Sequence, residues 1–379
     1  MKICIFPCSN KGGIDTYTKE LARAIRERTN YEVCTVGDIR IATKKGLIPQ
    51  IDLPDIKTKS MYYTPFPTLE LGYKYSKLIN DMAVDIAHSG SSSSMAFVRI
   101  NVPLIVTAWF YPSSLLGSLS IINKYTNWWK FPFATPIRLQ TSFADVLGYK
   151  KASKIICVTK ALEKDLLDKG YNSIYIPPAI EIMDTNSNKK YDKITIIFIS
   201  YDLANKRKGL EYLLDALNEI KKCRLSKEEF ILKLIGNPSK RLFDLVSMYE
   251  PLKKNIEITG TLPRDETLST LSKSHILVAP SVYEEFGYTV LEAMMLGIPV
   301  IASDIHSFQD LISDKVGFLI NIKNRKEFVE KLSLLMNEEN IREEMGKNAR
   351  RRVTKKFSWD VILPNVIKLY RSLEGEEES

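Results

Sequence analysis

The 379-residue chain is 45% hydrophobic and 10% aromatic, which is typical of a globular protein and excludes a disordered one. Its length fits two domains of roughly 150–200 residues, and no apolar run reaches the roughly 18–20 residues of a membrane span. The five cysteines are scattered, and with only three histidines no metal quartet is expected. We therefore expect buried thiols in a reducing, cytoplasmic setting.

The net charge of +9 is concentrated in the first half of the chain, where residues 1–183 carry +8 and residues 184–379 carry +1. A basic half favours an anionic partner, and both nucleic acid and a membrane surface are candidates. No helix-turn-helix, zinc-finger or RNA-binding signature is present in the sequence. We therefore expect no nucleic acid and prefer an anionic membrane face or a lipid phosphate.

At the amino terminus, a strand is predicted over residues 2–6 and an amphipathic helix over 16–28, with Gly12 and Gly13 in the intervening loop. A strand–Gly-Gly–helix unit favours the approach of a phosphate group. It matches neither the P-loop nor the dinucleotide fingerprint. A plain tight turn is the alternative interpretation.

Three features follow in the first half. His88 ends a predicted strand, where it either borders a ligand or has a structural role. Trp109 comes shortly after the buried strand predicted over 102–107. The segment 121–133 combines five aromatic residues with two lysines, which suits a bilayer interface, although a core helix or a cap on the first domain fits equally well.

The second half begins after a polar linker at 184–192, with a strand predicted over 194–199 and a helix over 210–220. Lys206, Arg207 and Lys208 stand in a row just before this helix. Cations at such a position can neutralise phosphate oxygens, and arginine can do so with two hydrogen bonds. A solvated basic turn is the alternative.

The stretch 276–302 is predicted to form a strand, a glycine-containing loop, a helix and another strand. Gly287 lets the backbone come close to a ligand, and the N–H groups of the following helix start favour phosphate. Glu284 and Glu292 bracket this loop, and their carboxylates suit neutral hydroxyl groups beside the phosphates. The combination predicts a nucleotide-sugar, and the alternative is an ordinary exposed helix start.

This stretch resembles the E-x7-E signature of the retaining glycosyltransferases of family 4, which have the GT-B fold, since E-x-F-G and G-x-P-V-I-A-S also match. The resemblance implies that Glu284 contacts the donor sugar and Glu292 the ribose, with the loop amides near the diphosphate. It also implies that Lys208 contacts the donor phosphates. The expected donor-binding residues are Gly12, Gly13, Lys208, Glu284, Phe286, Gly287, Tyr288, Thr289 and Glu292, and the expected catalytic residues are Glu284, Arg207 and Lys208.

Two departures from the family accompany these matches. The family's Gly-Arg pair is missing, because Ile199-Ser200 stands there, and Arg207 or Lys206 is expected to compensate. The family's T-x-H is replaced by a sequence ending in Trp109, whose indole can stack on a sugar face but cannot shuttle a proton. His88 matches the histidine of the family's D-x-x-H, so the resemblance implies that His88 and Trp109 lie on the acceptor side.

We therefore expect an α/β protein of GT-B architecture, with two doubly wound Rossmann-like domains facing a central cleft. Residues 1–183 would form the acceptor domain and 184–356 the donor domain, with a helix at 357–373 packing back onto the first. The expected activity is transfer of a hexose from a UDP- or GDP-linked sugar to a glycan or lipid-linked acceptor, without metal or other cofactor. The enzyme would be cytoplasmic, with possible peripheral membrane contact through 121–133. The alternatives are a nucleotide-sugar epimerase or hydrolase of the same fold, and a non-catalytic scaffold.

Overall fold

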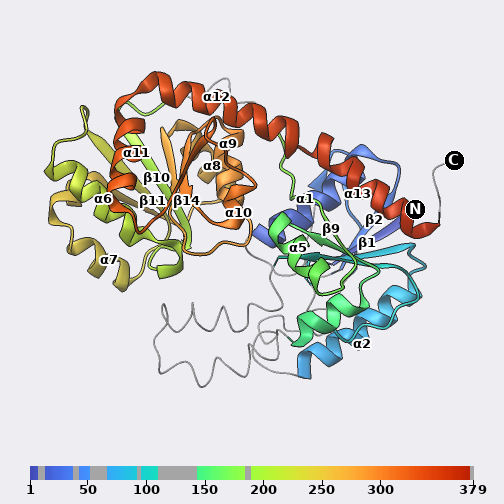
Figure 1. Cartoon of the computed structure of the whole chain (residues 1–379). Helices are drawn as coiled ribbons and strands as arrows, with labels where there is room; N and C mark the ends of the chain where they lie inside the picture. The colour runs from blue at the N-terminus through green and yellow to red at the C-terminus, as the bar shows by residue number, and fades with distance from the viewer. Residues whose placement is uncertain are drawn as a thin grey trace. The chain divides into compact units, whose positions relative to one another are not determined.

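The computed structural model describes residues 1–6, 13–36, 42–51, 66–91, 95–109, 143–183 and 189–375. The chain divides into two compact units (Figure 1). Unit 1 contains residues 1–181 and 359–379, and unit 2 contains residues 182–358. The boundaries expected from the sequence, after 183 and after 356, each lie two residues from these division points.

Unit 1 is built on a seven-stranded parallel sheet with the order β5-β2-β1-β6-β7-β8-β9. Parallel strands need crossover connections, and several of these contain helices. Because all carboxyl ends of such a sheet meet at one edge, the segments after β1, β6 and β7 leave from the same edge. The strands are β1 (Lys2–Phe6), β2 (Glu32–Val36), β5 (Gln50–Ile51), β6 (Ile86–Ser89), β7 (Leu104–Ala108), β8 (Lys154–Cys157) and β9 (Ser173–Tyr175), and the short pair β3 (Ala42–Thr43) and β4 (Gly46–Leu47) lies outside the sheet.

The described helices of unit 1 include one from the carboxyl-terminal end of the chain. They include α1 (Gly13–Arg28), α2 (Phe66–Asp81), α5 (Lys160–Asp168) and α13 (Trp359–Glu374), and residues 143–151 are also helical. The buried face of α13 includes Trp359, Val366 and Tyr370. Trp359 stacks on Tyr17 of α1 at a centroid distance of 6.3 Å, so the last helix completes the core of unit 1.

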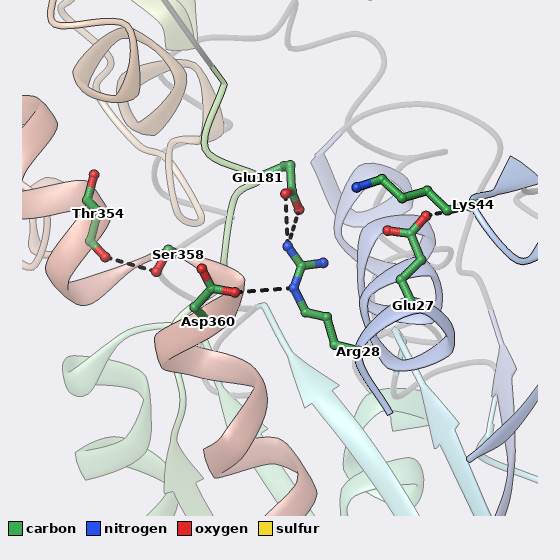
Figure 2. A network of polar contacts seen from close by, with 7 residues as sticks. All are labelled: Glu27, Arg28, Lys44, Glu181, Thr354, Ser358 and Asp360. Atoms are coloured by element: carbon green, nitrogen blue, oxygen red, sulfur yellow. Dashed lines mark hydrogen bonds and ion pairs between the residues drawn. The ribbon is translucent and has the colours of Figure 1, made fainter. Parts of the chain in front are cut away.

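One guanidinium connects α1 to both places where the chain passes between the units (Figure 2). Arg28, the last residue of α1, donates from Nη2 to both carboxylate oxygens of Glu181 at 2.8 and 2.9 Å, and its Nε lies 3.3 Å from Oδ1 of Asp360. Glu181 is the last residue of the first segment of unit 1, and Asp360 is the second residue of α13. Arg28 therefore ties the end of one segment to the beginning of the other.

Unit 2 is built on a six-stranded parallel sheet with the order β12-β11-β10-β13-β14-β15. The strands are β10 (Ile194–Asp202), β11 (Phe230–Asn237), β12 (Ile256–Gly260), β13 (Ile276–Ala279), β14 (Val300–Ser303) and β15 (Gly317–Ile320). The helices are η4 (Lys206–Lys208), α6 (Leu210–Lys222), α7 (Lys240–Ser247), η5 (Glu250–Asn255), α8 (Arg264–Lys273), α9 (Tyr288–Met295), α10 (His306–Gln309), α11 (Arg325–Asn337) and α12 (Glu339–Lys356).

Helices cover both faces of this sheet, with α6 and α11 on one side and α8, α9 and α10 on the other (Figure 1). Alternate residues of β10, Ile194, Ile196 and Phe198, belong to the core shared with α6 and α11. The intervening Thr195 and Ile197 are also buried, because the opposite face is covered as well. This two-sided burial explains why the strand is nearly continuously apolar.

Two further features concern the described parts of the chain. None of the helices there is long and apolar enough to cross a bilayer. Nor do three or more His, Cys, Asp or Glu side chains in those parts gather where they could hold a metal ion.

Candidate functional site

The basic turn of unit 2 is held against the segment that follows β13. Asn205 caps η4 by accepting a hydrogen bond from Arg207 N, and Gly209 ends it with a φ of +73°. A Cβ at Gly209 would lie 1.9 Å from the carbonyl oxygen of Pro280, so only glycine allows this close approach. Val282 N donates to Arg207 O at 2.8 Å, which joins the two segments through their backbones.

This contact places Lys208 on the first carboxylate of the predicted pair. Lys208 Nζ donates to Glu284 Oε2, and Arg207 Nη1 lies 3.6 Å from Glu284 Oε1. Burial alone would raise the pKa of Glu284, but the charges of Lys208 and then Arg207 outweigh it and hold that pKa below its ordinary value. Glu284 is therefore ionised at neutral pH and can only accept hydrogen bonds.

A second carboxylate lies beside the first, and the sequence interpretation overlooked it. Glu285 Oε2 is 3.6 Å from Arg207 Nη1, the same nitrogen that approaches Glu284. Burial and then the charge of Glu284 raise the pKa of Glu285 from 4.5 to about 7. The adjacent acidic residue was visible in the sequence, but only the position of Arg207 shows that the two carboxyl groups share one cation.

The glycine predicted to admit a ligand begins helix α9. Gly287 has a φ of +103°, and a Cβ there would lie 2.5 Å from Cε1 of Phe308, so the position requires glycine. The helix begins without a side-chain cap, and the N–H groups of a first turn have no partner within their own helix. Phe286 is only 2% exposed and lies edge-on to Tyr288, so its backbone is the part that could meet a ligand.

The second predicted carboxylate has an arginine partner that the sequence did not indicate. Glu292 Oε1 lies 3.2 Å from Nη2 of Arg264, the first residue of α8. Glu292 is 14% exposed and Arg264 is 40% exposed, so the pair is reachable from solvent. Arg264 follows a proline in an otherwise unremarkable polar segment, and no sequence pattern connects it to a residue of α9.

The two residues expected on the acceptor side are both buried inside unit 1. His88 Nδ1 lies 2.6 Å from Tyr370 Oη of α13, and His88 Nε2 lies 2.8 Å from Thr107 Oγ1. Burial lowers the pKa of His88 to about 3, so the ring is neutral. This geometry favours the structural alternative for His88, because both of its nitrogens are occupied.

Trp109 has a comparable environment. Its indole N–H donates to the carbonyl oxygen of Gly90 at 3.1 Å, its ring lies edge-on to Tyr17, and 4% of it is exposed. In this arrangement the ring packs within unit 1 and does not offer a face to a sugar. Gly13 is exposed as the first residue of α1, whereas Gly12 and the segment 121–133 lie outside the described residues.

In unit 2, therefore, the structure brings Arg207 and Lys208 together with Glu284, and it places Glu284 in the loop before α9 and Glu292 on that helix. A cationic turn beside a glycine-capped helix start offers positive charge and N–H donors to an anion. The neighbouring ionised carboxylate offers acceptors to hydroxyl groups. Together with two parallel, helix-covered sheets, these features define the class as a glycosyltransferase of GT-B fold.

Comparison with known proteins gives the family. Residues 181–352 match the family described as glycosyl transferases group 1. This part of the chain belongs to the family, which is the family 4 expected from the E-x7-E stretch, and the protein is a glycosyltransferase that uses nucleotide sugars.

Several relatives match over nearly their whole length. An uncharacterized glycosyltransferase of Methanocaldococcus jannaschii is 26% identical over 96% of this chain and 95% of its own. The phosphatidyl-myo-inositol mannosyltransferase of Mycobacterium leprae is 24% identical over 98% of this chain and 96% of its own.

Solved structures share the fold. Sucrose-phosphate synthase from Thermosynechococcus elongatus superposes with a TM-score of 0.77 at 18% identity, covering 99% of this chain and 100% of its own. The Anabaena protein HepE, solved in complex with UDP-glucose, gives a TM-score of 0.67 at 16% identity, covering 98% of this chain and 100% of its own.

Proposed function

We propose that the protein is a retaining glycosyltransferase that moves a hexose from a UDP- or GDP-linked donor to a glycan or lipid-linked acceptor. The observation that carries this proposal is the contact of Lys208 with Glu284 directly before the glycine-capped start of α9. The names of two relatives agree with it, since one is a mannosyltransferase acting on phosphatidyl-myo-inositol and another holds UDP-glucose.

In this proposal Lys208 lies between the sites of the sugar and the diphosphate and contacts both. A lysine ammonium has three protons, and Glu284 uses one of them. The remaining two can reach a phosphate oxygen of the donor, while the ionised Glu284 accepts hydroxyl groups of the hexose. Lys208 would then stabilise the charge that grows on the departing diphosphate, with Arg207 adding to the positive potential.

The other donor residues surround this centre. The backbone amides from Phe286 to Thr289 would approach the diphosphate, and Glu292 would accept the ribose hydroxyl groups while Arg264 holds one of its oxygens. Gly12 and Gly13 are proposed to approach the diphosphate from unit 1. Residues 1–181 would supply the acceptor site, with His88 and Trp109 supporting it from the interior.

We propose that the reaction proceeds on one face of the sugar. The bond between the anomeric carbon and the diphosphate oxygen breaks, and the bond to the acceptor oxygen forms on the same side. The leaving phosphate oxygen takes the proton of the acceptor hydroxyl. This route needs no carboxylate as general base, and both carboxylates of the signature remain available for binding.

Nucleotide release from a panel of NDP-sugars, measured with and without a lipid-linked acceptor, tests the proposal. Release that requires the acceptor, with an α-linked product from an α-linked donor, is the expected result. An isomerised donor would indicate an epimerase, acceptor-independent release a hydrolase, and no turnover of any donor a scaffold.

We also propose peripheral contact with an anionic membrane through residues 121–133, supported by the aromatic and basic composition of that segment and by the charge excess of the first half. Co-sedimentation with vesicles containing anionic lipid should decrease as salt is raised. A variant with Lys124 and Lys130 replaced by glutamine should bind less, and a complete absence of binding at low salt would contradict the contact.

A further inference from the structure

Glu285 lies in the proposed donor site of unit 2, next to Glu284, the first glutamate of the E-x7-E signature. Arg207 Nη1 donates to the carbonyl oxygen of Tyr283 at 2.9 Å and lies 3.6 Å from one carboxylate oxygen of Glu284 and of Glu285. Its guanidinium carbon also lies 6.0 Å from the ring centre of Tyr283. The guanidinium thus contacts three consecutive residues, and one of its nitrogens is shared between the two carboxyl groups.

The two carboxyl groups are not equivalent in this cluster. Glu284 has Lys208 as a second cationic partner, whereas Glu285 has only the shared Arg207 among the ion pairs of the described residues. Two adjacent, partly buried carboxylates cannot both ionise at little cost, so the group with fewer cations keeps its proton to higher pH. Among the described residues, the charged groups that act on Glu285 are Glu284 from its own loop and Arg207 from η4; Tyr283 lies two positions earlier in the loop, and Lys208 contacts Glu284.

We propose that Glu285 is a positioning residue of the donor site: as a neutral acid it donates a hydrogen bond to Glu284, and its ionisation sets the charge that the site presents to the donor diphosphate. This inference rests on the proposed function. The raised pKa of Glu285, about 7, agrees with it, since burial and the charge of Glu284 both favour the protonated form.

The two states of Glu285 differ in what they offer a ligand. With Glu285 protonated, Arg207 and Lys208 outweigh the single charge of Glu284, and the cluster carries one net positive charge. The hydrogen bond from Glu285 also occupies one lone pair of Glu284 and holds its carboxylate in one orientation. With Glu285 ionised, the cluster is neutral and that hydrogen bond is lost. A diphosphate should therefore bind more tightly below the midpoint of this titration than above it.

The test is the dissociation constant of an NDP-sugar measured by titration calorimetry from pH 6.0 to 8.5, with UDP-glucose and GDP-mannose as probes. The diphosphate of such a donor is esterified at both ends, so the probe itself does not titrate in this range. For the unmodified protein we expect the dissociation constant to rise about tenfold across the range, as one charge within several ångströms of a diphosphate implies.

Glu285→Gln keeps the shape and the hydrogen-bond donor of the protonated acid, so it should bind the donor at pH 6.0 within about twofold of the unmodified protein and lose most of the pH dependence. Glu285→Ala lacks the donor and should bind more weakly than Glu285→Gln at every pH. Glu343→Gln, on the exposed surface of α12, is the matched control and should behave like the unmodified protein.

A dissociation constant that does not change with pH, or Glu285→Gln with the same slope as the unmodified protein, would overturn the role of Glu285 while leaving the proposed function intact. Binding of neither donor at any pH would overturn both. A folded Glu285→Gln variant that no longer binds the donor at pH 6.0 would also overturn the role of Glu285, because a neutral side chain at this position should be sufficient for binding.

Discussion

Gly209 is a position at which adding a single methyl group should disturb the site. In Gly209→Ala, the new methyl group would lie 1.9 Å from the carbonyl oxygen of Pro280, which is backbone and cannot turn aside as a flexible side chain could. To relieve this overlap, either η4 or the segment after β13 must move. Both movements stretch the hydrogen bond from Val282 N to Arg207 O and draw Lys208 away from Glu284.

The expected loss of stability has two parts. Alanine in the left-handed region costs about 1–2 kcal/mol relative to glycine, and Gly209 has a φ of +73°. Relief of the overlap should add about 1–3 kcal/mol, the range found when well-packed interiors are overfilled. We therefore expect Gly209→Ala to lower the free energy of unfolding of unit 2 by about 2–5 kcal/mol.

A matched control separates the two parts. Gly260, also in unit 2, has a φ of +77°, and a Cβ there would meet nothing within 4 Å. Gly260→Ala should lose only the conformational part, about 1–2 kcal/mol. Urea-induced unfolding of both variants follows the same transition, because both glycines lie in unit 2. Equal destabilisation by the two substitutions would refute the close contact between η4 and Pro280.

Three further predictions concern single side chains. Lys208→Ala should lower kcat more than it raises KM in steady-state transfer assays, because its charge acts mainly on the departing diphosphate; a change in KM alone would contradict this. Glu285→Gln should stabilise unit 2 above pH 7 but not at pH 5, since the pKa of Glu285 is raised from 4.5 to about 7 and the unmodified protein loses stability as pH rises through that window. The gain in the free energy of unfolding is at most about 3 kcal/mol, and we expect about 1–2 kcal/mol because the Glu285 side chain is 24% exposed. Thermal unfolding at both pH values measures this gain. Equal shifts in Tm at the two pH values would exclude the proton on Glu285. Tyr370→Phe should destabilise unit 1 by about 1–2 kcal/mol in urea, because it leaves Nδ1 of the buried His88 unpaired; an unchanged midpoint would show that this hydrogen bond contributes nothing.

The sequence was sufficient for features that depend on neighbouring residues. Buried parallel strands are continuous apolar runs, so β10, β13 and β14 could be located directly, and Gly287 followed by helical spacing located the start of α9. Glu284, Glu292, the E-x-F-G residues and the G-x-P-V-I-A-S tail lie within one such segment, and their combination indicated the family.

The rest depended on contacts between residues far apart in the chain. Arg207 and Glu285 are 78 positions apart, and their contact follows from how β10 and β13 pair in the sheet. The basic turn was expected to face phosphate or, in the alternative, solvent, and the structure shows its two last cations paired with carboxylates. His88 was placed correctly at a strand end, but the sequence could not show that Tyr370, from the last helix, would bury it.

The central claim is that a nucleotide-sugar binds to unit 2 through the carboxylates that bracket the start of α9. The measurement that tests it most directly is titration calorimetry of UDP-glucose and GDP-mannose against the unmodified protein and against Glu292→Ala. The account predicts that at least one donor binds the unmodified protein and that Glu292→Ala binds it at least about tenfold more weakly, because ribose hydroxyl groups lose their acceptor. Unchanged affinity in a folded Glu292→Ala variant, or no binding of either donor, would contradict it.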